Sequence, residues 1–372
     1  MSKSSNIKTD LKISKKGISK FWFNYFWNEL VLKHEDNISW YYLSENPNIS
    51  WDIVKDNPDK PWDWEQISRN PNITWDIVKA NPDTLWCWKW LSRNSSITID
   101  NVKCNPDKPW DWEKLSTNPN LTGEFIQENI DKPWDWEWLS RNSNITWEII
   151  KANPNKPWCW NGISSNPNIT WDIINNNPDK PWIWLWISLN PNITDNIIRE
   201  YPNNPWDWKW LSRNPNITIE LIKENPDKPW RWDWLSNNPN ITWDFVKENI
   251  NKSWDWFSLS SKSIITWEIV NEKPNMPWNW YRLSINPNIT WEIVKANPDM
   301  PWSSLGLSGN PNITIDIITE NPNYEWNWCW LSQKKNITFE FVKKHLDKPL
   351  EWDYLSQNQF TKEKELFMEN EK

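Results

Sequence analysis

A block of twelve residues recurs through this chain at a fixed spacing, and this recurrence constrains the fold more than any other feature. At 70–81 the block reads Asn-Pro-Asn-Ile-Thr-Trp-Asp-Ile-Val-Lys-Ala-Asn, and with the accompanying block Pro-Asp-Lys-Pro-Trp-Asp-Trp it belongs to a unit of 24 residues. Adding 24 to Trp62 gives tryptophan at every step as far as Trp326, without insertion or deletion. A period between about 20 and 50 residues indicates a repeat array. We therefore expect one elongated domain.

The unit Asp59–Pro82 names the repeat positions used below, so the Trp62 position comprises every residue that lies a multiple of 24 away from Trp62. Its first half predicts a short helix A over 61–69, because proline suits the first helical position. Asp63 then falls in the first turn, where a carboxylate favours the positive end of the helix. The run Asn70-Pro71-Asn72 ends the helix, since a residue before proline avoids the α region.

The second half of the unit predicts a helix B that starts after Thr74 and stops at Asn81-Pro82. The Thr74 position holds threonine twelve times and serine once, and such hydroxyls cap helix N-termini. Ile73 and Val78 stand at the spacing of a hydrophobic staple. Two helices of about two turns each are not stable alone. The prediction is therefore an all-α fold, an α-solenoid of about 13 two-helix repeats with terminal capping helices. A leucine-rich β-solenoid has an overlapping period, but its strand pattern is missing.

Helical geometry at 100° per residue assigns faces to both helices. In helix A the inward side carries Trp64, Ile67 and Ser68, and the variable side carries Glu65, Gln66 and Arg69. In helix B we expect Ile77, Val78 and Asn81 inside, and Asp76, Lys79 and Ala80 outside. The Ser68 position is serine in all fourteen copies, which suggests close helix contact or a bond to a neighbouring backbone carbonyl. The recurring Asn81 either links successive units in a ladder or reflects turn preference.

The segments outside the repeats differ in composition. Residues 1–20 are rich in lysine and serine and are expected to form a flexible basic tail, and 21–36 form an N-terminal cap. The array covers 37–358, and the charged segment 359–372 is expected to be a polar C-terminal cap or tail. Solenoid ends need such atypical covers.

Charge and cysteine usage bear on location and partners. The net charge of −8 disfavours nucleic-acid and anionic-membrane binding. No apolar run reaches the length of a membrane span, and the aromatic segment 21–32 makes a poor signal-peptide core. The four cysteines lie in different repeats and are expected to stay unpaired. These features together predict an intracellular protein.

Catalytic and cofactor motifs are missing from the sequence. His34 and His345 have no second histidine or cysteine at metal-ligand spacing, so we expect no metal site. No glycine-rich phosphate loop and no nucleophile elbow occurs. Carboxylates recur at the Asp76 position in twelve of thirteen copies and at the Asp63 position in several, which fits helix-end electrostatics better than many equivalent active sites. We predict a non-enzymatic protein without a cofactor.

The tandem blocks Asn-Pro-Asn-Ile-Thr-Trp-Asp-Ile-Val and Asp-Lys-Pro-Trp-Asp-Trp resemble the short tryptophan-rich repeats of proteins from large amoeba-infecting DNA viruses of the mimivirus type. The resemblance covers 37–358. It implies a viral protein of unassigned role, made in the host cytoplasm, with the virion as an alternative location. It transfers no catalytic residue.

Function is expected to reside in the variable positions of the array. The expected role is a scaffold for protein–protein interaction, whose partner is another protein or a second copy of this chain. Single-stranded nucleic-acid or carbohydrate binding through exposed tryptophan are the alternatives. Three consecutive units carry tryptophan at both the Trp62 and Gln66 positions, which we place four residues apart on one side of helix A. The candidate partner-binding residues are Trp182, Ile183, Leu185, Trp186, Leu189, Trp206, Trp210, Arg213, Trp230 and Trp234.

Overall fold

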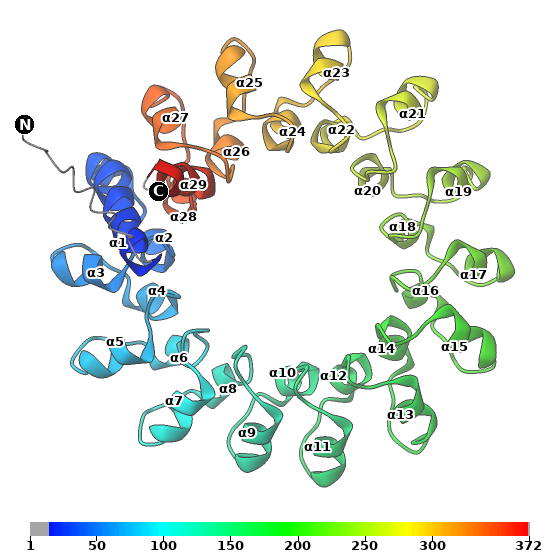
Figure 1. The fold of residues 1–372 in the computed structure, drawn as a ribbon. Helices are drawn as coiled ribbons and strands as arrows, with labels where there is room; N and C mark the ends of the chain where they lie inside the picture. The colour runs from blue at the N-terminus through cyan, green and yellow to red at the C-terminus, as the bar shows by residue number, and fades with distance from the viewer. Residues whose placement is uncertain (1–14, 371–372) are drawn as a thin grey trace, which may run out of the picture. The chain divides into compact units, whose positions relative to one another are not determined.

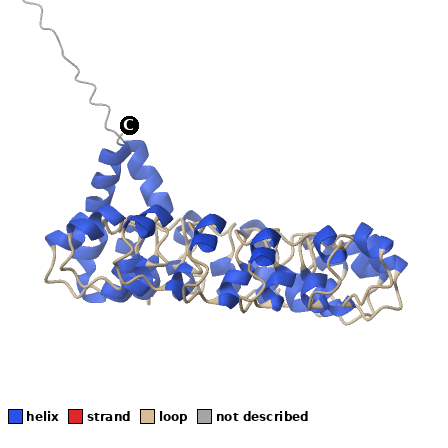
Figure 2. Cartoon of the chain, turned by 90° about the horizontal axis from the view of Figure 1, so that it is seen from below, coloured by secondary structure: helices blue, strands red, loops and turns tan. Residues whose placement is uncertain are grey.

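The computed structural model describes residues 15–370, with side chains described from residue 20 to residue 369. Within residues 15–370 the chain forms helices and no strand, and two short helices recur in every repeat. This arrangement confirms the predicted α-solenoid (Figures 1 and 2). The chain divides into two compact units, one made of Met1–Trp86 with Trp328–Lys372 and the other of Cys87–Asn327. Within Cys87–Asn327 the A helices follow the concave side and the B helices the convex side.

Each repeat contributes one A helix and one B helix of four to six residues. The A helices are α2 (Trp40–Glu45), α4 (Trp64–Arg69), α6 (Trp88–Leu91), α8 (Trp112–Leu115), α10 (Trp136–Arg141), α12 (Trp160–Ser165), α14 (Trp184–Leu189), α16 (Trp208–Leu211), α18 (Trp232–Leu235), α20 (Trp256–Ser260), α22 (Trp280–Ile285), α24 (Ser304–Gly309), α26 (Trp328–Ser332) and α28 (Trp352–Gln357). The B helices are α3 (Trp51–Asp56), α5 (Trp75–Ala80), α7 (Ile99–Cys104), α9 (Gly123–Glu128), α11 (Trp147–Ala152), α13 (Trp171–Asn175), α15 (Asp195–Glu200), α17 (Ile219–Glu224), α19 (Trp243–Glu248), α21 (Trp267–Glu272), α23 (Trp291–Ala296), α25 (Ile315–Glu320) and α27 (Phe339–Lys344).

Helix A starts three residues later than the sequence predicted. Asp63 is the N-cap of α4, and its carboxylate accepts a hydrogen bond from Gln66 N at 2.9 Å. Pro61 lies before the helix, and Trp62 N donates to the Lys60 carbonyl at 2.8 Å. The expectation of helix from Pro61 was wrong because the side-chain cap at Asp63 satisfies the first free N–H groups. The Trp62 position is therefore not part of helix A.

Helix B has the predicted boundaries. Thr74 is the N-cap of α5, although its side chain makes no capping hydrogen bond, and Thr98 forms a capping box with Asn101 on α7. Asp76, Lys79 and Ala80 are exposed as expected, and Val78 is buried. The helix thus presents its charged residues to solvent.

Tryptophan rings join consecutive repeats. The ring at the Trp64 position meets the ring at the Trp62 position of the next repeat edge to face, as in Trp112 with Trp134 at 5.0 Å and 89°. Such edge-to-face pairs are favoured over face-to-face sandwiches. The buried ring also uses its N–H group, since Trp134 Nε1 donates to the Asn129 carbonyl at 2.8 Å. The tryptophan repeat is therefore the core between neighbouring units.

The invariant serine connects the same neighbours through the backbone. Ser116 Oγ donates to the Trp112 carbonyl at 3.1 Å and accepts from Asp135 N, the N-cap of the next A helix, at 3.0 Å. This arrangement confirms the close helix contact expected at the position, with a backbone N–H as the partner in the next repeat. A larger side chain would displace the next repeat.

The ladder between repeats is formed by the asparagines that the sequence analysis treated only as helix terminators. Asn190 Nδ2 donates to the carbonyls of Ser164, Asn166 and Ile169 in the preceding repeat, at 2.9, 3.1 and 3.3 Å. Asn192, which stands at the Asn72 position, adds bonds to the same loop.

The recurring Asn81 does not link successive units. Its Nδ2 donates to the Ile77 carbonyl of its own helix at 2.7 Å. The hypothesis that the Asn81 side chain forms a ladder between units is therefore wrong, and the alternative of a local turn preference is confirmed.

Two repeats break the ladder with a lysine at the Asn70 position. Lys262 Nζ donates to the Asn238 carbonyl at 2.6 Å, one bond in place of the three that Asn190 makes at the equivalent position. Burial lowers the pKa of Lys262 to about 8, and likewise that of Lys334 to about 8. The contact between Asn238 and Lys262 is therefore weaker than its equivalents at neutral pH, where the buried amine carries a charge.

The substitution Lys262→Asn is expected to stabilise the protein by about 1–2 kcal/mol at pH 7, because it restores the amide donor and removes a buried charge. The folded-state pKa of about 8 lies below the unfolded value of roughly 10.4. Between these values the unfolded state binds more protons, so the native protein gains stability as the pH rises. The gain from the substitution should thus shrink between pH 8 and 10 in urea titrations. Lys295→Asn, at an exposed position of α23, is the control. A stability gain from Lys262→Asn that grows with pH would contradict the lowered pKa of Lys262.

The two chain ends pack against each other in the unit that contains both. Helix α1 (Lys15–Phe26) begins within the segment predicted as a tail, and it continues through a π-helical turn η1 (Trp27–Val31) and a 3-10 helix η2 (Leu32–Asn37). Helix α29 (Thr361–Asn370) lies beside α1 (Figure 2). For residues 1–14, the prediction of a flexible basic tail lies outside the described residues.

Candidate interaction surface

Three tryptophan rings contact one another in a tilted stack along the row of A helices in Cys87–Asn327, with interplanar angles of 38° and 60°. Trp186, Trp210 and Trp234 occupy the Gln66 position on α14, α16 and α18. The ring centroids of Trp186 and Trp210 are 5.9 Å apart, and those of Trp210 and Trp234 are 5.1 Å apart. Equivalent positions of adjacent repeats thus face each other, so identical aromatic residues in successive repeats form a continuous stack.

Arginine side chains cover this stack. The Arg213 guanidinium lies 5.7 Å from the Trp210 ring and 4.8 Å from the Trp234 ring. Arg231 lies 4.7 Å from the Trp234 ring and is paired with Asp233. A cation over an indole face at such distances is attracted by the ring quadrupole. The arginines therefore fix the rings and bring positive charge to the surface.

A glycine allows a third arginine to reach the stack from two repeats away. Gly162 holds the Gln66 position on α12, and a Cβ there would lie 2.9 Å from Ser140 Cβ and 3.1 Å from Arg141 Cγ. Without that side chain, Arg141 extends along α12 to within 5.4 Å of the Trp186 ring centroid. The close approach requires glycine, which has no side chain to displace the arginine.

Aliphatic residues border the rings on α14. Ile183 is 37% exposed, and Leu185 and Leu189 are partly exposed. Other repeats carry charged residues at these three positions, as in Asp63, Glu65 and Arg69. The predicted apolar cluster on the variable side is thus present at these residues.

The structure extends the surface beyond the sequence-predicted residues. Phe257 on α20 is 48% exposed, and the Arg282 guanidinium lies 4.3 Å from its ring centroid. Phe257 occupies the Glu65 position, as Leu185 does. An apolar residue at the Glu65 position was the signal that identified Leu185, and the same signal identifies Phe257.

We use the name aromatic–arginine surface for Arg141, Ile183, Leu185, Trp186, Leu189, Trp210, Arg213, Arg231, Trp234, Phe257 and Arg282.

Three predicted binding residues are core instead. Trp182, Trp206 and Trp230 precede α14, α16 and α18 and are at most 9% exposed. Trp206 packs against Trp171 at 5.4 Å and Trp184 at 5.3 Å. The assumption that the Trp62 and Gln66 positions share a helical side was wrong because helix A begins only at the Trp64 position. These three rings cannot take part in the surface without unfolding the repeat interface.

Two of the four arginines in the aromatic–arginine surface form no ion pair with a carboxylate of the described residues. Among the ion pairs of the described residues, Arg231 pairs with Asp233 and Arg141 with Glu137, whereas Arg213 and Arg282 pair with none. The nearby aspartates serve helix ends: Asp207 accepts from Lys209 N and Trp210 N, and Asp255 accepts from Phe257 N and Ser258 Oγ. A chain of net charge −8 thus presents two guanidinium groups, those of Arg213 and Arg282, without an ion-pair partner among the described residues.

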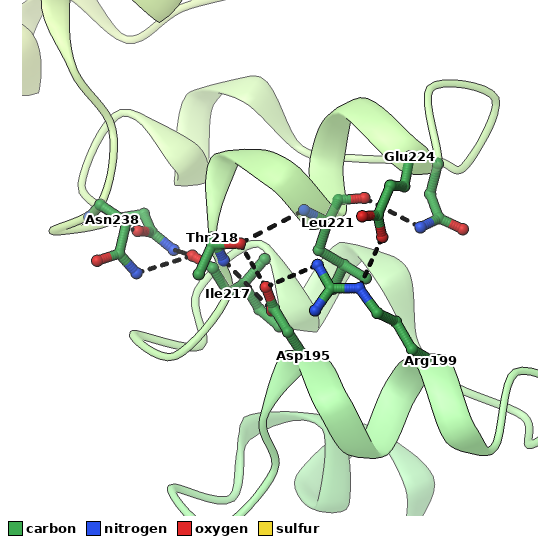
Figure 3. Close-up of polar contacts among 9 residues, drawn as sticks. Asp195, Arg199, Ile217, Thr218, Leu221, Glu224 and Asn238 are labelled. Carbon is green, nitrogen blue, oxygen red and sulfur yellow. Dashed lines mark hydrogen bonds and ion pairs between the residues drawn. The ribbon is translucent and has the colours of Figure 1, made fainter.

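A second unusual site replaces tryptophan with a buried carboxylate. Asp195 stands at the Trp75 position and is 7% exposed. It accepts hydrogen bonds from Thr218 N at 3.3 Å and from the Thr218 hydroxyl, and pairs with Arg199 Nη2 at 3.5 Å (Figure 3). Arg199 Nε also donates to Glu224 at 2.7 Å. This network links α15 to α17, and its buried oxygens are satisfied, so we assign it a structural role.

No protein-family model, curated protein or solved structure matches this chain. The resemblance of its repeat blocks to viral tryptophan-rich repeats therefore stays a prediction. Between residues 15 and 370 no cluster of three or more His, Cys, Asp or Glu side chains could hold a metal ion. In the same range no helix combines the length and apolar character needed to cross a bilayer.

Proposed function

We propose that this chain is a non-enzymatic repeat scaffold that binds a protein partner through the aromatic–arginine surface. The observation that carries the proposal is the row of contacting rings of Trp186, Trp210 and Trp234, with the Arg213 guanidinium beside two of them. Tryptophan and arginine are the residues most enriched at binding hot spots. Exposed apolar clusters of this kind mark interaction sites.

The surface favours a partner segment that combines acidic and aliphatic side chains. Arg213 and Arg282 have no carboxylate partner among the described residues, so acidic side chains of a ligand would complete them. Ile183, Leu185 and Leu189 provide an aliphatic area beside these charges. Complementary charge would set orientation and association rate, while apolar burial would supply affinity.

The same residues support a protein over a single-stranded nucleic acid or a carbohydrate. Base stacking needs an open aromatic face, and the Trp210 ring lies between those of Trp186 and Trp234, with Arg213 beside it. Aliphatic side chains offer no stacking platform. Trp138, 57% exposed on α10, is the ring best placed for either alternative ligand.

The decisive variant combines Leu185→Glu, Trp186→Gln and Leu189→Arg, which restores residue types found in other repeats. It is expected to leave helicity nearly intact and to weaken binding at least tenfold, because it removes the hydrophobic centre of the surface. Binding is measured by fluorescence anisotropy with a 20-residue amphipathic peptide of leucine and glutamate. Poly-glutamate and an oligo-deoxythymidine serve as competing probes.

The control variant carries Asn175→Glu and Asn176→Arg, which introduce the same charges at exposed positions on α13. It should bind like the native protein. Equal binding by the triple variant would place the partner surface elsewhere, and unfolding of the triple variant would show that the cluster is core. Stronger binding to oligo-deoxythymidine than to either peptide, lost in Trp138→Ala, would replace the protein partner with nucleic acid.

A further inference from the structure

The last A helix docks on the first repeat, although about 310 residues separate them in the sequence. Ser39 N donates to Ser356 Oγ at 3.0 Å. Asn46 Nδ2 donates to the carbonyls of Ser356 at 2.7 Å and Asn358 at 3.1 Å. Asn48 Nδ2 donates to the Gln359 carbonyl at 3.0 Å. Helices α2 and α28 are accordingly in direct contact.

These bonds repeat those between two repeats that follow each other directly. Asp63 N donates to Ser44 Oγ at 3.0 Å. Asn70 Nδ2 donates to the carbonyls of Ser44 at 3.0 Å and Asn46 at 2.9 Å. Asn72 Nδ2 donates to the Pro47 carbonyl at 2.8 Å. The contact between α28 and the first repeat, which we call the terminal junction, is therefore an ordinary repeat interface without a direct covalent connection.

Helices α1 and α29 take the place of the B helix that α28 lacks. Trp22 and Phe360 are fully buried, and Trp22 Nε1 donates to Asn48 Oδ1 at 2.8 Å. Phe360 adopts a left-handed φ of 48°, which is rare for a residue with a side chain. Its ring packs against Phe339 at 4.8 Å. The strained backbone is held by this packing.

Polar contacts fasten the same two chain ends. Tyr25 donates a hydrogen bond from its hydroxyl to Glu363 at 3.1 Å, and burial, with the Glu363 carboxylate beside it, raises the pKa of Tyr25 to about 12. Lys343 pairs with Glu29 at 2.6 Å. Side chains from the N-terminal and C-terminal segments thus form polar contacts with each other.

We propose that the terminal junction also forms between copies of this chain, with the first repeat of one copy docked on α28 of another. The two faces are complementary and differ from each other, so the contact is head to tail and yields dimers with two junctions or longer chains. A junction between two copies contains the same hydrogen bonds as the junction within a single chain. The ratio of junctions between copies to junctions within one chain therefore depends on the protein concentration. It is compared with the effective concentration of the tethered ends, which is roughly millimolar.

The test refolds the full chain from denaturant at about 1 µM, far below the effective concentration of the tethered ends, and at several hundred micromolar, which approaches it. Multi-angle light scattering after dilution is expected to show monomer in the first sample and twofold or larger masses in the second. Those species should persist on dilution, because reversal requires the junction to open. Refolding two differently tagged chains together should give mixed dimers only at the high concentration.

Matched variants locate the contact. Asn46→Ala removes two junction bonds, whereas Asn190→Ala removes the equivalent bonds inside the array. Asn46→Ala is expected to speed the return of dimers to monomers about tenfold relative to Asn190→Ala, as the loss of these hydrogen bonds implies. The triple variant of the aromatic–arginine surface should exchange normally. Monomer at every concentration, equal rates for the two alanine variants, or dimers lost in the triple variant would each overturn the proposal.

Discussion

Trp206→Ala is expected to lower the free energy of unfolding by about 3–5 kcal/mol, as large core truncations do. Trp206 is 5% exposed and its ring packs on Trp171 and Trp184. Its Nε1 also donates to the Tyr201 carbonyl at 2.9 Å, which the substitution leaves without that donor. The cavity would open between two repeats and weaken the contacts of both.

Trp210→Ala is the matched variant, four residues away in the same repeat. Its ring is half-buried in the stack with Trp186 and Trp234, so we expect a loss of only about 1–2 kcal/mol. Urea unfolding followed by far-ultraviolet circular dichroism at a wavelength free of indole bands compares the two midpoints. Peptide binding should fall for Trp210→Ala and persist in folded Trp206→Ala. Similar midpoints would contradict the division of these tryptophans into core and surface.

Ser116→Leu is expected to destabilise the protein by about 1–3 kcal/mol more than Lys114→Leu, because of overpacking at the repeat interface. Ser116 is 1% exposed and sits between the Trp112 carbonyl and Asp135 N. Lys114, two residues earlier on α8, is itself partly exposed. Leucine has room at Lys114 and none at Ser116.

Ser116→Ala separates the two causes of this loss. It removes both hydrogen bonds without adding volume, so its midpoint should fall between those of the other variants. Thermal unfolding of the three variants at one scan rate provides the comparison. Equal midpoints for Ser116→Leu and Lys114→Leu would show that the inward face of helix A is wrongly assigned.

Helix boundaries and hydrogen-bond partners were predicted with unequal success. The end of helix A at Asn70 follows from local chemistry, since the next residue is Pro71. The start was misplaced because both Pro61 and Asp63 are good residues near a helix N-terminus, and only the structure shows that Asp63 caps. The role of Asn70 escaped detection because its three acceptor carbonyls lie 21 to 26 residues earlier, in another repeat.

The candidate surface shows the same division. Leu185 and Leu189 could be found from the sequence, because apolar residues replace the charged ones of other repeats. Trp206 could not be separated from Trp210, since both are tryptophans in the same short block. Arg141 could not be placed over Trp186, because the contact spans two repeats and depends on the missing side chain of Gly162.

The sequence by itself determined the 24-residue period, the number of repeats, the two-helix unit and the inward serine and leucine positions. These properties follow from local helix caps, proline breaks and residue spacing, which act within one unit. Only the tertiary structure decided which asparagines join the repeats, which tryptophans remain accessible, and that α28 meets the first repeat. Each of those outcomes depends on how one unit lies against another, and identical units carry no sequence signal for that geometry.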